Sequence, residues 1–335
     1  MAKQFLQFRH NLVFWRNLVQ AGFLFWCLYL GFQFSHFVEH FTSKGEAPFV
    51  SRPPGVEAFL PIGALVSLKN LLLNGIIDPV HPAALILFLT FLALSLLARK
   101  SFCSWICPVG TLSELLWRSG ESLTGRRVKL WRWLDILLRS TKYLLLFFFL
   151  KLILFGMPAQ ALKGFLSTPY WAISDVKMLH FFTSPSTLSV VIILILMVLS
   201  FFIRQFWCRY LCPYGALLGF FSFVSPCRIT RDIDGCTACG SCDQACPASI
   251  DVSRKRQVTS MECTGCLSCV QSCPEHQVLG MGVVSSRRFL PSWLFPLLVL
   301  LVFTSGVAFG MLSGHWHSSL SYRDYSQLIP LLNRF

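Results

Sequence analysis

The sequence predicts an α-helical polytopic membrane protein that carries a small inserted α+β domain. Three observations lead to this fold class. The 335 residues are 54% hydrophobic and only 13% charged, which is too apolar for an ordinary soluble domain. Eight of the 14 cysteines form two closely spaced runs between Cys236 and Cys273. Four more cysteines form two copies of a shorter motif, each a few residues after an apolar stretch.

Five apolar stretches approach the length of about 20 residues that a helix needs to cross a bilayer. The third and fourth have short apolar cores, so we expect these helices to extend into the flanking residues. The stretches are Leu12–Gln33, Pro82–Ala98, Tyr143–Met157, Val190–Ile203 and Phe289–Gly310. The sequence therefore predicts about five transmembrane helices. Because no small-residue cleavage site follows the first stretch, we expect it to be a retained anchor and not a signal peptide.

The positions of the basic residues predict the orientation of these helices. With five helices, one side of the membrane holds the N-terminal segment with Lys3 and Arg9, residues 99–142 and residues 204–288. This side has 20 of the 29 lysines and arginines, and the opposite side has seven. Because cytoplasmic loops carry the excess of basic residues, we expect the N-terminus and the inserted domain in the cytoplasm. The C-terminus then lies in the periplasm of a bacterial inner membrane. This distribution explains the net charge of +14 without a nucleic-acid partner.

An internal repeat organises the predicted membrane core. The motif Cys103-x3-Cys107-Pro108 returns 105 residues later as Cys208-x3-Cys212-Pro213, with similar residues around it. Each copy follows the predicted cytoplasmic end of an apolar helix. We infer two helix-pair units in parallel orientation, which together predict a pseudo-symmetric core of four helices.

The two long cysteine runs have the spacing of bacterial two-cluster ferredoxins. In each run the first three cysteines surround one cluster, and the fourth, which precedes a proline, turns to the other cluster. We therefore assign Cys236, Cys239, Cys242 and Cys273 to one [4Fe–4S] cluster, and Cys263, Cys266, Cys269 and Cys246 to a second. Zinc sites and disulfides are the alternatives. Zinc knuckles use pairs of cysteines, however, and disulfide frameworks belong to small secreted chains.

Together, the repeated short motif and the ferredoxin runs resemble membrane-bound bacterial polyferredoxins of the NapH, NosR and CcoG type. The resemblance extends over roughly Leu12 to Pro274. It implies an inner-membrane iron–sulfur protein linked to respiratory quinols, nitrous oxide reduction or copper handling. The predicted domains are a membrane core of two helix-pair repeats (residues 1–225), a cytoplasmic two-cluster ferredoxin domain (226–283), and a fifth transmembrane helix with a periplasmic tail (284–335).

We call Cys103, Cys107, Cys208 and Cys212 the cysteine quartet, and it has two interpretations. At a helix end, positions i and i+4 face the same way, so each pair offers two thiolates to one side of a metal or redox centre. Pseudo-symmetry would then bring the two pairs together. The alternative is buried structural cysteines or a dithiol, with the proline simply ending the helix. Two copies at equal depth favour a third redox or metal centre, and the quartet is our catalytic candidate.

Polar residues beyond the outer helix ends are weaker candidates. His36, Glu39 and His40 follow the first helix, and Asp78 and His81 precede the second at the same predicted depth. Either group could hold a quinol headgroup, and the first could also hold a metal or a haem. Polar and aromatic residues at a membrane boundary are, however, common without any such function.

Four further residues have predicted roles on or near the helices. Arg16 and Gln20 form a polar face on the first helix, where we favour anchoring at the membrane boundary over quinone docking. Cys27 is expected to pack within the first helix. Cys227, which precedes the ferredoxin runs, is expected to be a spare thiol and not a ligand.

The sequence supports three hypotheses of function. The favoured one is a relay of single electrons between the membrane quinone pool and a redox partner protein or respiratory complex, as in a quinol dehydrogenase subunit. The second is a CcoG-like assembly factor that reduces metal ions, copper above all, for a respiratory complex. The third is a structural subunit whose clusters connect the centres of a larger complex.

The orientation can be tested with reporter fusions. A reporter fused after Gly282 is expected in the cytoplasm and one fused after Ser319 in the periplasm, because the predicted fifth helix lies between them. Alkaline phosphatase activity and fluorescence of a cytoplasm-dependent protein would measure the two sides. If both fusions report the same side, the five-helix model is wrong, and the last helix is the first to be removed from it.

Overall fold

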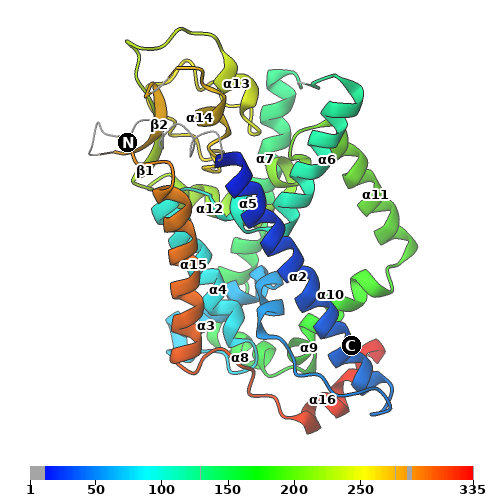
Figure 1. Ribbon diagram of the computed structural model, residues 1–335. Helices are drawn as coiled ribbons and strands as arrows, with labels where there is room; N and C mark the ends of the chain where they lie inside the picture. Colours follow the sequence, from blue (N-terminus) through cyan, green and yellow to red (C-terminus); the bar gives the residue numbers. More distant parts are fainter. Residues whose placement is uncertain (1–11, 129, 276, 285–288, 335) are drawn as a thin grey trace. The chain divides into compact units, whose positions relative to one another are not determined.

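The computed structural model describes residues 12–128, 130–275, 277–284 and 289–334. Lys3 and Arg9, which enter the charge count above, lie outside the described residues. The helices are α2 (Leu12–Thr42), η1 (Pro54–Phe59), α3 (Pro61–Asn74), α4 (Pro82–Ala98), α5 (Phe102–Trp105), α6 (Pro108–Thr124), α7 (Arg132–Leu154), α8 (Ala159–Leu166), α9 (Pro169–Ala172), α10 (Ser174–Thr183), α11 (Thr187–Phe202), η2 (Trp207–Leu211), α12 (Pro213–Ser222), α13 (Ser241–Ala245), α14 (Ser268–Ser272), α15 (Leu294–Leu312), α16 (Tyr322–Leu328) and η3 (Ile329–Arg334). The strands are β1 (Cys227–Arg231) and β2 (Leu279–Val283) (Figure 1).

A helix occupies each of the five predicted apolar stretches, but not every one is long enough to be a span by itself. Within the described residues, α2 and α15 are long and apolar enough to cross a membrane. The pairs α7–α8 and α10–α11 meet the same criterion only if each bent pair is one span, and they bend by 98° and 75°. The apolar helix α4 has 17 residues. Two to four helices therefore qualify by length and composition, and the count of five stays a prediction.

Residue contacts divide the chain into two units, and the division falls inside all five of these long helices. Unit 1 comprises residues up to Leu24, Phe91–Leu146 and Ile195–Thr304. Unit 2 comprises Phe25–Thr90, Phe147–Leu194 and the residues from Ser305 onward. The loops that the charge count assigns to one side, 99–142 and 204–288, thus both belong to unit 1. The predicted domain boundaries at residues 225 and 283 follow another criterion and stay a prediction.

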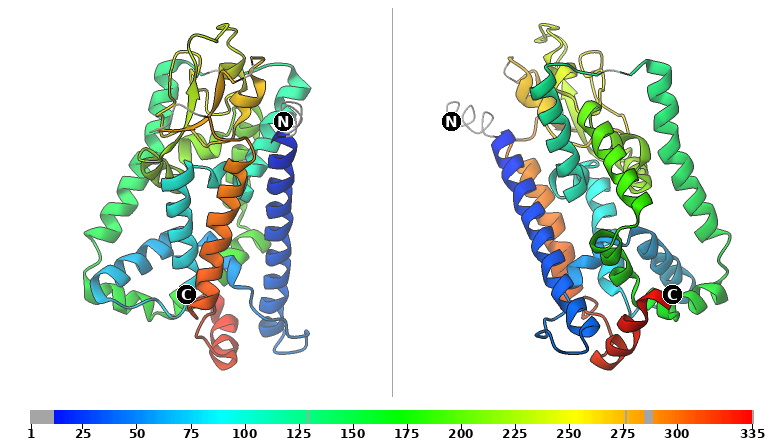
Figure 2. Two further views of the ribbon diagram at one scale, coloured as in Figure 1. Left: turned by 60° about the vertical axis from the view of Figure 1, so that its left-hand side comes forward. Right: turned by 90° about the vertical axis from the view of Figure 1, so that its right-hand side faces the viewer.

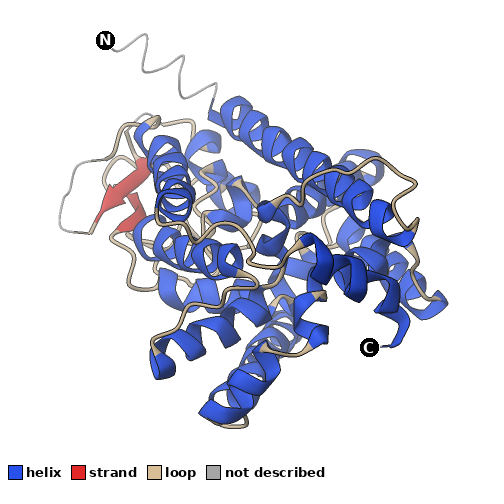
Figure 3. Cartoon of the chain, turned by 90° about the horizontal axis from the view of Figure 1, so that it is seen from below, coloured by secondary structure: helices blue, strands red, loops and turns tan. Residues whose placement is uncertain are grey.

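The inserted segment of unit 1 has the predicted α+β composition. Strands β1 and β2 pair antiparallel, with Cys227 opposite Val283 and Arg231 opposite Leu279. The two strands form a small ribbon (red in Figure 3). The short helices α13 and α14 pack against each other, and α14 also contacts β2. Strands and helices are this short because most of the segment consists of the cysteine loops between them.

Close packing of small and aromatic residues joins the helices of unit 1. The N-terminal part of α2 lies beside α15, where the rings of Phe23 and Phe303 meet edge to face with centroids 5.1 Å apart (Figure 2). Helix α6 approaches the end of α11 so closely that a Cβ atom on Gly120 would lie 1.9 Å from the carbonyl oxygen of Phe201. Only glycine fits at this position.

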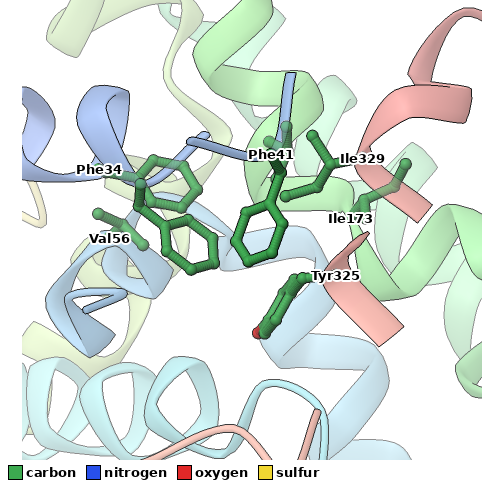
Figure 4. Packing of buried hydrophobic residues seen from close by; sticks show 8 residues of the cluster. Phe34, Phe41, Val56, Ile173, Tyr325 and Ile329 are labelled. Atoms are coloured by element: carbon green, nitrogen blue, oxygen red, sulfur yellow. The ribbon is translucent and has the colours of Figure 1, made fainter. Parts of the chain in front are cut away.

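The core of unit 2 is aromatic and aliphatic. It consists of Phe34, Phe37, Phe41, Val56, Ile173, Val176, Tyr325 and Ile329, each at most 5% exposed. Figure 4 shows how these side chains from α2, η1 and the C-terminal helices α16 and η3 converge. Burial of eight large apolar side chains explains why the C-terminal segment packs here and does not remain a free tail.

The glycine contact can be tested by adding one methyl group. We expect Gly120→Ala to reduce the free energy of unfolding by about 1–3 kcal/mol, because the new Cβ forces α6 away from α11. Gly22→Ala on α2 is the matched control, since nothing lies within 4 Å of a Cβ there. Thermal unfolding in detergent measures both variants. Equal melting temperatures for the two would contradict the close approach.

Candidate metal centres

The two ferredoxin loops have left-handed residues at matching positions, on both sides of the middle cysteine. In the first loop the middle cysteine, Cys239, is flanked by Ala238 (φ 55°) and Gly240 (φ 73°). In the second loop Gly265 (φ 62°) and Leu267 (φ 60°) flank Cys266 in the same way. The left-handed conformation is costly for Ala and Leu, so it indicates that the surrounding structure holds these loops in a fixed curve.

The fourth cysteine of each run also has matching geometry. Cys246 ends α13 and Cys273 ends α14, both with extended backbone (φ −73°, ψ 115° and φ −74°, ψ 120°). The proline that follows cannot continue the helix. In both runs the helix therefore ends at the fourth cysteine.

The first cavity of the inserted segment is lined by Cys236, Cys239, Cys242 and Cys273. These are the four cysteines that the sequence assigns to one cluster, three from the first run and one from the second. Cys242 is buried, whereas Cys239 is exposed. This cavity therefore opens to solvent on the side of Cys239.

The second cavity is lined by Cys246, Cys263, Cys266 and Cys269, again the predicted set. The two cavities have equal empty volumes of about 350 Å³. Three of the four cysteines of the second cavity are buried, and the remaining wall is apolar, with Ile229, Val252 and Val258 among its residues. The cysteines of the second cavity are thus more buried than those of the first.

The donor sets fit multi-iron clusters better than single ions. A tetrahedral ion with metal–sulfur bonds of about 2.3 Å holds its sulfur atoms within about 4 Å of one another. In the described part of the chain, no group of three or more His, Cys, Asp or Glu side chains is compact enough for one ion. Burial raises the pKa of Cys242 to about 11 and that of Cys246 to about 12. Such thiols ionise readily only when a metal centre compensates the charge, and a [4Fe–4S] cluster would do so while carrying single electrons.

Each half of the cysteine quartet lies at a break between two helices of unit 1. Cys103 is in the one-turn helix α5, and Cys107 is the N-cap of α6. Cys208 lies in η2, a π-type turn, and Cys212 is the N-cap of α12. The i, i+4 cysteines are therefore not neighbours on one helix face, as the sequence interpretation assumed. The reason is the proline, which cannot continue a helix but is favoured in the first turn of a new one.

The two breaks have the same backbone hydrogen bonds. The amide of Cys107 donates to the carbonyl of Phe102 at 2.9 Å, and the amide of Cys212 donates to that of Trp207 at 3.0 Å. The next helix starts when Thr111 and Ala216 donate to the two cysteine carbonyls, at 3.0 and 3.2 Å. In the first motif Gly110 is required, because a Cβ there would lie 2.1 Å from the carbonyl oxygen of Cys103.

The four thiols of the quartet are close enough to influence one another electrostatically. Burial raises the pKa of Cys208 well above its usual value, and the negative charges of Cys212, Cys107 and Cys103 raise it further. Burial raises the pKa of Cys103 to about 12. The positive charge of Lys100 opposes this rise, and the negative charge of Cys212, from the other motif, adds to it. The rings of Phe102, which precedes Cys103, and Tyr214, two residues after Cys212, also meet edge to face with centroids 6.0 Å apart, so the two motifs lie beside each other.

Residues between the quartet cysteines bind the loops of the second cavity. Ser104 donates to the carbonyl of Thr264 at 2.8 Å, and the indole nitrogen of Trp105 donates to that of Gly265 at 3.2 Å. From the other motif, Arg209 donates to Ser249, three residues after Cys246, at 2.9 Å. Both motifs thus contact the backbone that carries the second set of cysteines.

Two ion pairs, one buried and one partly exposed, add to this docking. Arg16 is fully buried on α2, where Nη2 contacts Glu114 at 2.5 Å and Nη1 donates to the carbonyl of Cys266 at 3.2 Å. Arg204 pairs with Glu121 at 2.5 Å and donates to the carbonyl of Cys246 at 3.2 Å. The predicted role of Arg16 as a membrane-boundary anchor is therefore wrong, since its guanidinium is inside the protein.

A third ion cluster lies between the quartet and the inserted segment, and we call Lys100, Lys142 and Glu262 the charge hub. Lys142 Nζ contacts both carboxylate oxygens of Glu262, at 2.7 and 2.6 Å, and Lys100 Nζ lies 3.4 Å away. Tyr143 donates to the same carboxylate at 3.0 Å. Burial alone would raise the pKa of Glu262, but the two lysines lower it to about 2.

The sequence interpretation missed the charge hub. It treated Lys100 as part of a topology signal and gave Glu262 no role. A signal was present, because Glu262 directly precedes Cys263 in the second ferredoxin run. An acidic residue there needs a cationic partner once the loop is buried.

Unit 2 contains a separate buried network around Arg52. The guanidinium contacts Glu57 at 2.8 Å and Asp175 at 2.7 Å. His81 lies 3.4 Å from Glu57. Burial lowers the pKa of His81, but its hydrogen bond to the Glu57 carboxylate and the charge of Asp175 raise this pKa overall. Asp78 is also buried, but it accepts a hydrogen bond from Trp171 and does not belong to the Arg52 ion pairs.

The other predicted quinol candidates do not converge. His36 pairs with Glu39 at 3.1 Å, and both side chains are exposed. His40 is buried and bonded instead to the carbonyl of Ala47 at 2.6 Å and to the hydroxyl of Tyr322 at 2.9 Å. The structure therefore gives His40 a structural partner and does not form a joint site from these residues.

Comparison with known proteins agrees with this geometry. A family model described as a 4Fe-4S binding domain matches residues 80–130 and 185–226, which contain the two halves of the quartet. A model described as a 4Fe-4S dicluster domain matches residues 228–274. The chain is 43% identical over 325 residues to YccM of Escherichia coli (strain K12), which is named as a candidate electron transport protein. The match covers 96% of this chain and 91% of YccM.

The chain belongs to the family of membrane-associated polyferredoxins. Partial matches extend to other members. The methylamine utilization ferredoxin-type protein MauN of Paracoccus denitrificans is 30% identical over 50% of this chain and 54% of its own length. The regulatory protein NosR of Pseudomonas aeruginosa is 32% identical over 38% of this chain and 18% of its own. No solved structure matches the chain.

The assignment of cysteines to the two cavities can be tested by substitution. We expect Cys266→Ser to lose the cluster of the second cavity and to destabilise the first, because each cavity takes one cysteine from the other run. Cys239→Ser should do the reverse. Iron content and the EPR spectrum of the reduced protein measure the loss. The matched control is Cys227→Ser, which changes a buried cysteine that lines neither cavity. Loss of one cluster with an unaltered signal from the other would contradict the shared fold.

Proposed function

We propose that the protein relays single electrons between the membrane quinone pool and a redox partner through two [4Fe–4S] clusters and a third centre at the cysteine quartet. The observation that carries the proposal is the convergence of the four quartet thiols beside the loops of the second cavity. Two cavities with four cysteines each and a third group of four thiols make a series of candidate sites within unit 1. The quinone pool and the redox partner are proposed from the family resemblance.

The difference in exposure between the cavities suggests the order of transfer. The first cavity opens to solvent beside Cys239, so we assign it the exchange of electrons with the redox partner. The cysteines of the second cavity are more buried, and its loops contact both quartet motifs, so we assign it the inner position. Enclosure and hydrogen bonds to the sulfur atoms are among the factors that set cluster potentials. The amide of Ile250, for example, donates to Cys246 Sγ at 3.4 Å.

We propose a third [4Fe–4S] cluster at the quartet. Four cysteine thiolates are the usual ligand set of such a cluster. The family model that matches both motifs is described as a 4Fe-4S binding domain, which supports the choice.

We also propose the predicted orientation, with the inserted segment and residues 99–142 on the cytoplasmic side of a bacterial inner membrane. The charge count supports this, as does the grouping of both segments in unit 1. The five long helices would then each cross the membrane, with α4 as a short span.

Metal analysis of the anaerobically purified protein tests the third centre. Two clusters give about eight irons per chain, and a third raises the count to about 12 with equal acid-labile sulfide. We expect the double variant Cys103→Ser/Cys208→Ser to return to about eight irons with both ferredoxin signals intact. A wild-type count near eight, with no other metal and no titratable disulfide, would show that the quartet is structural.

The electron donor is tested on the same preparation. Reduction of the clusters by a quinol analogue supports the quinone relay, and the double quartet variant should lose it. Reduction of Cu²⁺ without any dependence on quinol would favour the metal-reductase function instead. If neither reaction occurs, the structural subunit is the remaining hypothesis.

A further inference from the structure

The charge hub has more positive than negative charge, although it is buried. The side chains of Lys100, Lys142 and Glu262 are 4%, 0% and 9% exposed. Two ammonium groups share one carboxylate, so the hub carries a net charge of +1 when all three are ionised. A buried charge without a partner is costly, and proteins seldom keep one unless an opposite charge lies nearby.

The opposite charge is available at the cysteine quartet. Lys100 is three residues before Cys103, whose backbone amide donates to the Lys100 carbonyl at 3.2 Å. Burial raises the pKa of Cys103 to about 12, and the positive charges of Lys100 and Lys142 act against this rise. The same two lysines lower the pKa of Cys212, which burial raises. Ser104, which follows Cys103, donates to the carbonyl of Thr264, two residues after Glu262, at 2.8 Å, so the hub lies beside the first motif.

The hub also contacts the second cavity. Glu262 is the residue before Cys263, and its backbone amide donates a hydrogen bond to Ser260 Oγ at 3.2 Å at the start of the loop. The carboxylate thus joins the loop of the second cavity to two lysines that act on the quartet. No other acidic side chain contacts either lysine among the ion pairs of the described residues.

We propose that Lys100 and Lys142 set the reduction potential of the quartet centre by compensating its negative charge, and that Glu262 limits this effect. The inference rests on the proposed third centre. A cluster with four thiolates is anionic, and reduction adds one negative charge. Nearby positive charge stabilises the reduced form and raises the potential, whereas nearby negative charge lowers it. The lysines and Glu262 are positioning residues here, since none of them is a ligand.

Three substitutions of similar shape test the sign of each charge. We expect Lys100→Met and Lys142→Met to lower the potential of the quartet centre and Glu262→Gln to raise it. The expected size is at least a tenfold change in the one-electron equilibrium constant, which corresponds to 59 mV. The charge-neutral double variant Lys142→Met/Glu262→Gln should lie close to the wild type, and the conservative variant Lys142→Arg should retain the wild-type potential.

Redox titration of the full-length protein, followed by EPR, measures these potentials, and the signal that Cys103→Ser removes identifies the quartet centre. Lys151→Met is the matched control, because Lys151 lies on the same helix as Lys142 but is exposed. A purely structural hub predicts loss of iron in all three variants without potentials that move in opposite directions. That result, or unchanged potentials, would overturn the inference while the third centre remains. A wild-type protein with only eight irons would instead overturn the proposed function, and the inference with it.

Discussion

The carboxylate of Glu262 is the contact on which the arrangement of unit 1 depends. It joins the inserted segment to the residues after α4 through Lys100 and to α7 through Lys142. Removing one partner of such a buried group leaves an uncompensated charge, which typically costs about 3–5 kcal/mol. The three segments therefore cannot separate independently. Arg16 with Glu114 and Arg204 with Glu121 add contacts at other points of the same region, where each arginine also donates to the carbonyl of a cysteine of the second cavity.

Backbone conformation determines where the cysteine sulfur atoms are placed. The ferredoxin loops use left-handed residues beside Cys239 and Cys266 to curve around a cavity. The quartet motifs use proline to break a helix directly after Cys107 and Cys212, so that one cysteine ends a turn and the next begins a helix. Both solutions occur twice with the same dihedral angles or hydrogen bonds. Such duplication at fixed offsets is expected when the geometry of a bound group, and not packing alone, determines the backbone.

The cysteine sets of the two cavities could be predicted from the sequence because their spacing is local and chemically specific. The apolar helices could be located for the same reason, since a run of apolar residues needs no knowledge of distant partners. As expected from its short apolar core, α7 extends into the flanking residues, and it begins at Arg132, well before Tyr143. Its first turns contain Asp135, whose charge is neutralised by Arg209 at 2.8 Å. Hydropathy alone would exclude these polar residues from the helix.

Contacts between residues distant in the sequence could not be predicted from it. Nothing local distinguishes Arg16, which is buried against Glu114, from a basic residue at a membrane boundary. Likewise, His81 and Asp78 looked alike as boundary residues, yet only His81 joins the ion network of Arg52. The quartet shows the limit most clearly, because the correct grouping was inferred from an i, i+4 helix face that does not exist. The two motifs come together instead through two broken helices. The positive charge hub beside them explains why the thiols are grouped, because buried thiols and excess buried cations stabilise each other only when the thiols are ionised around a shared centre.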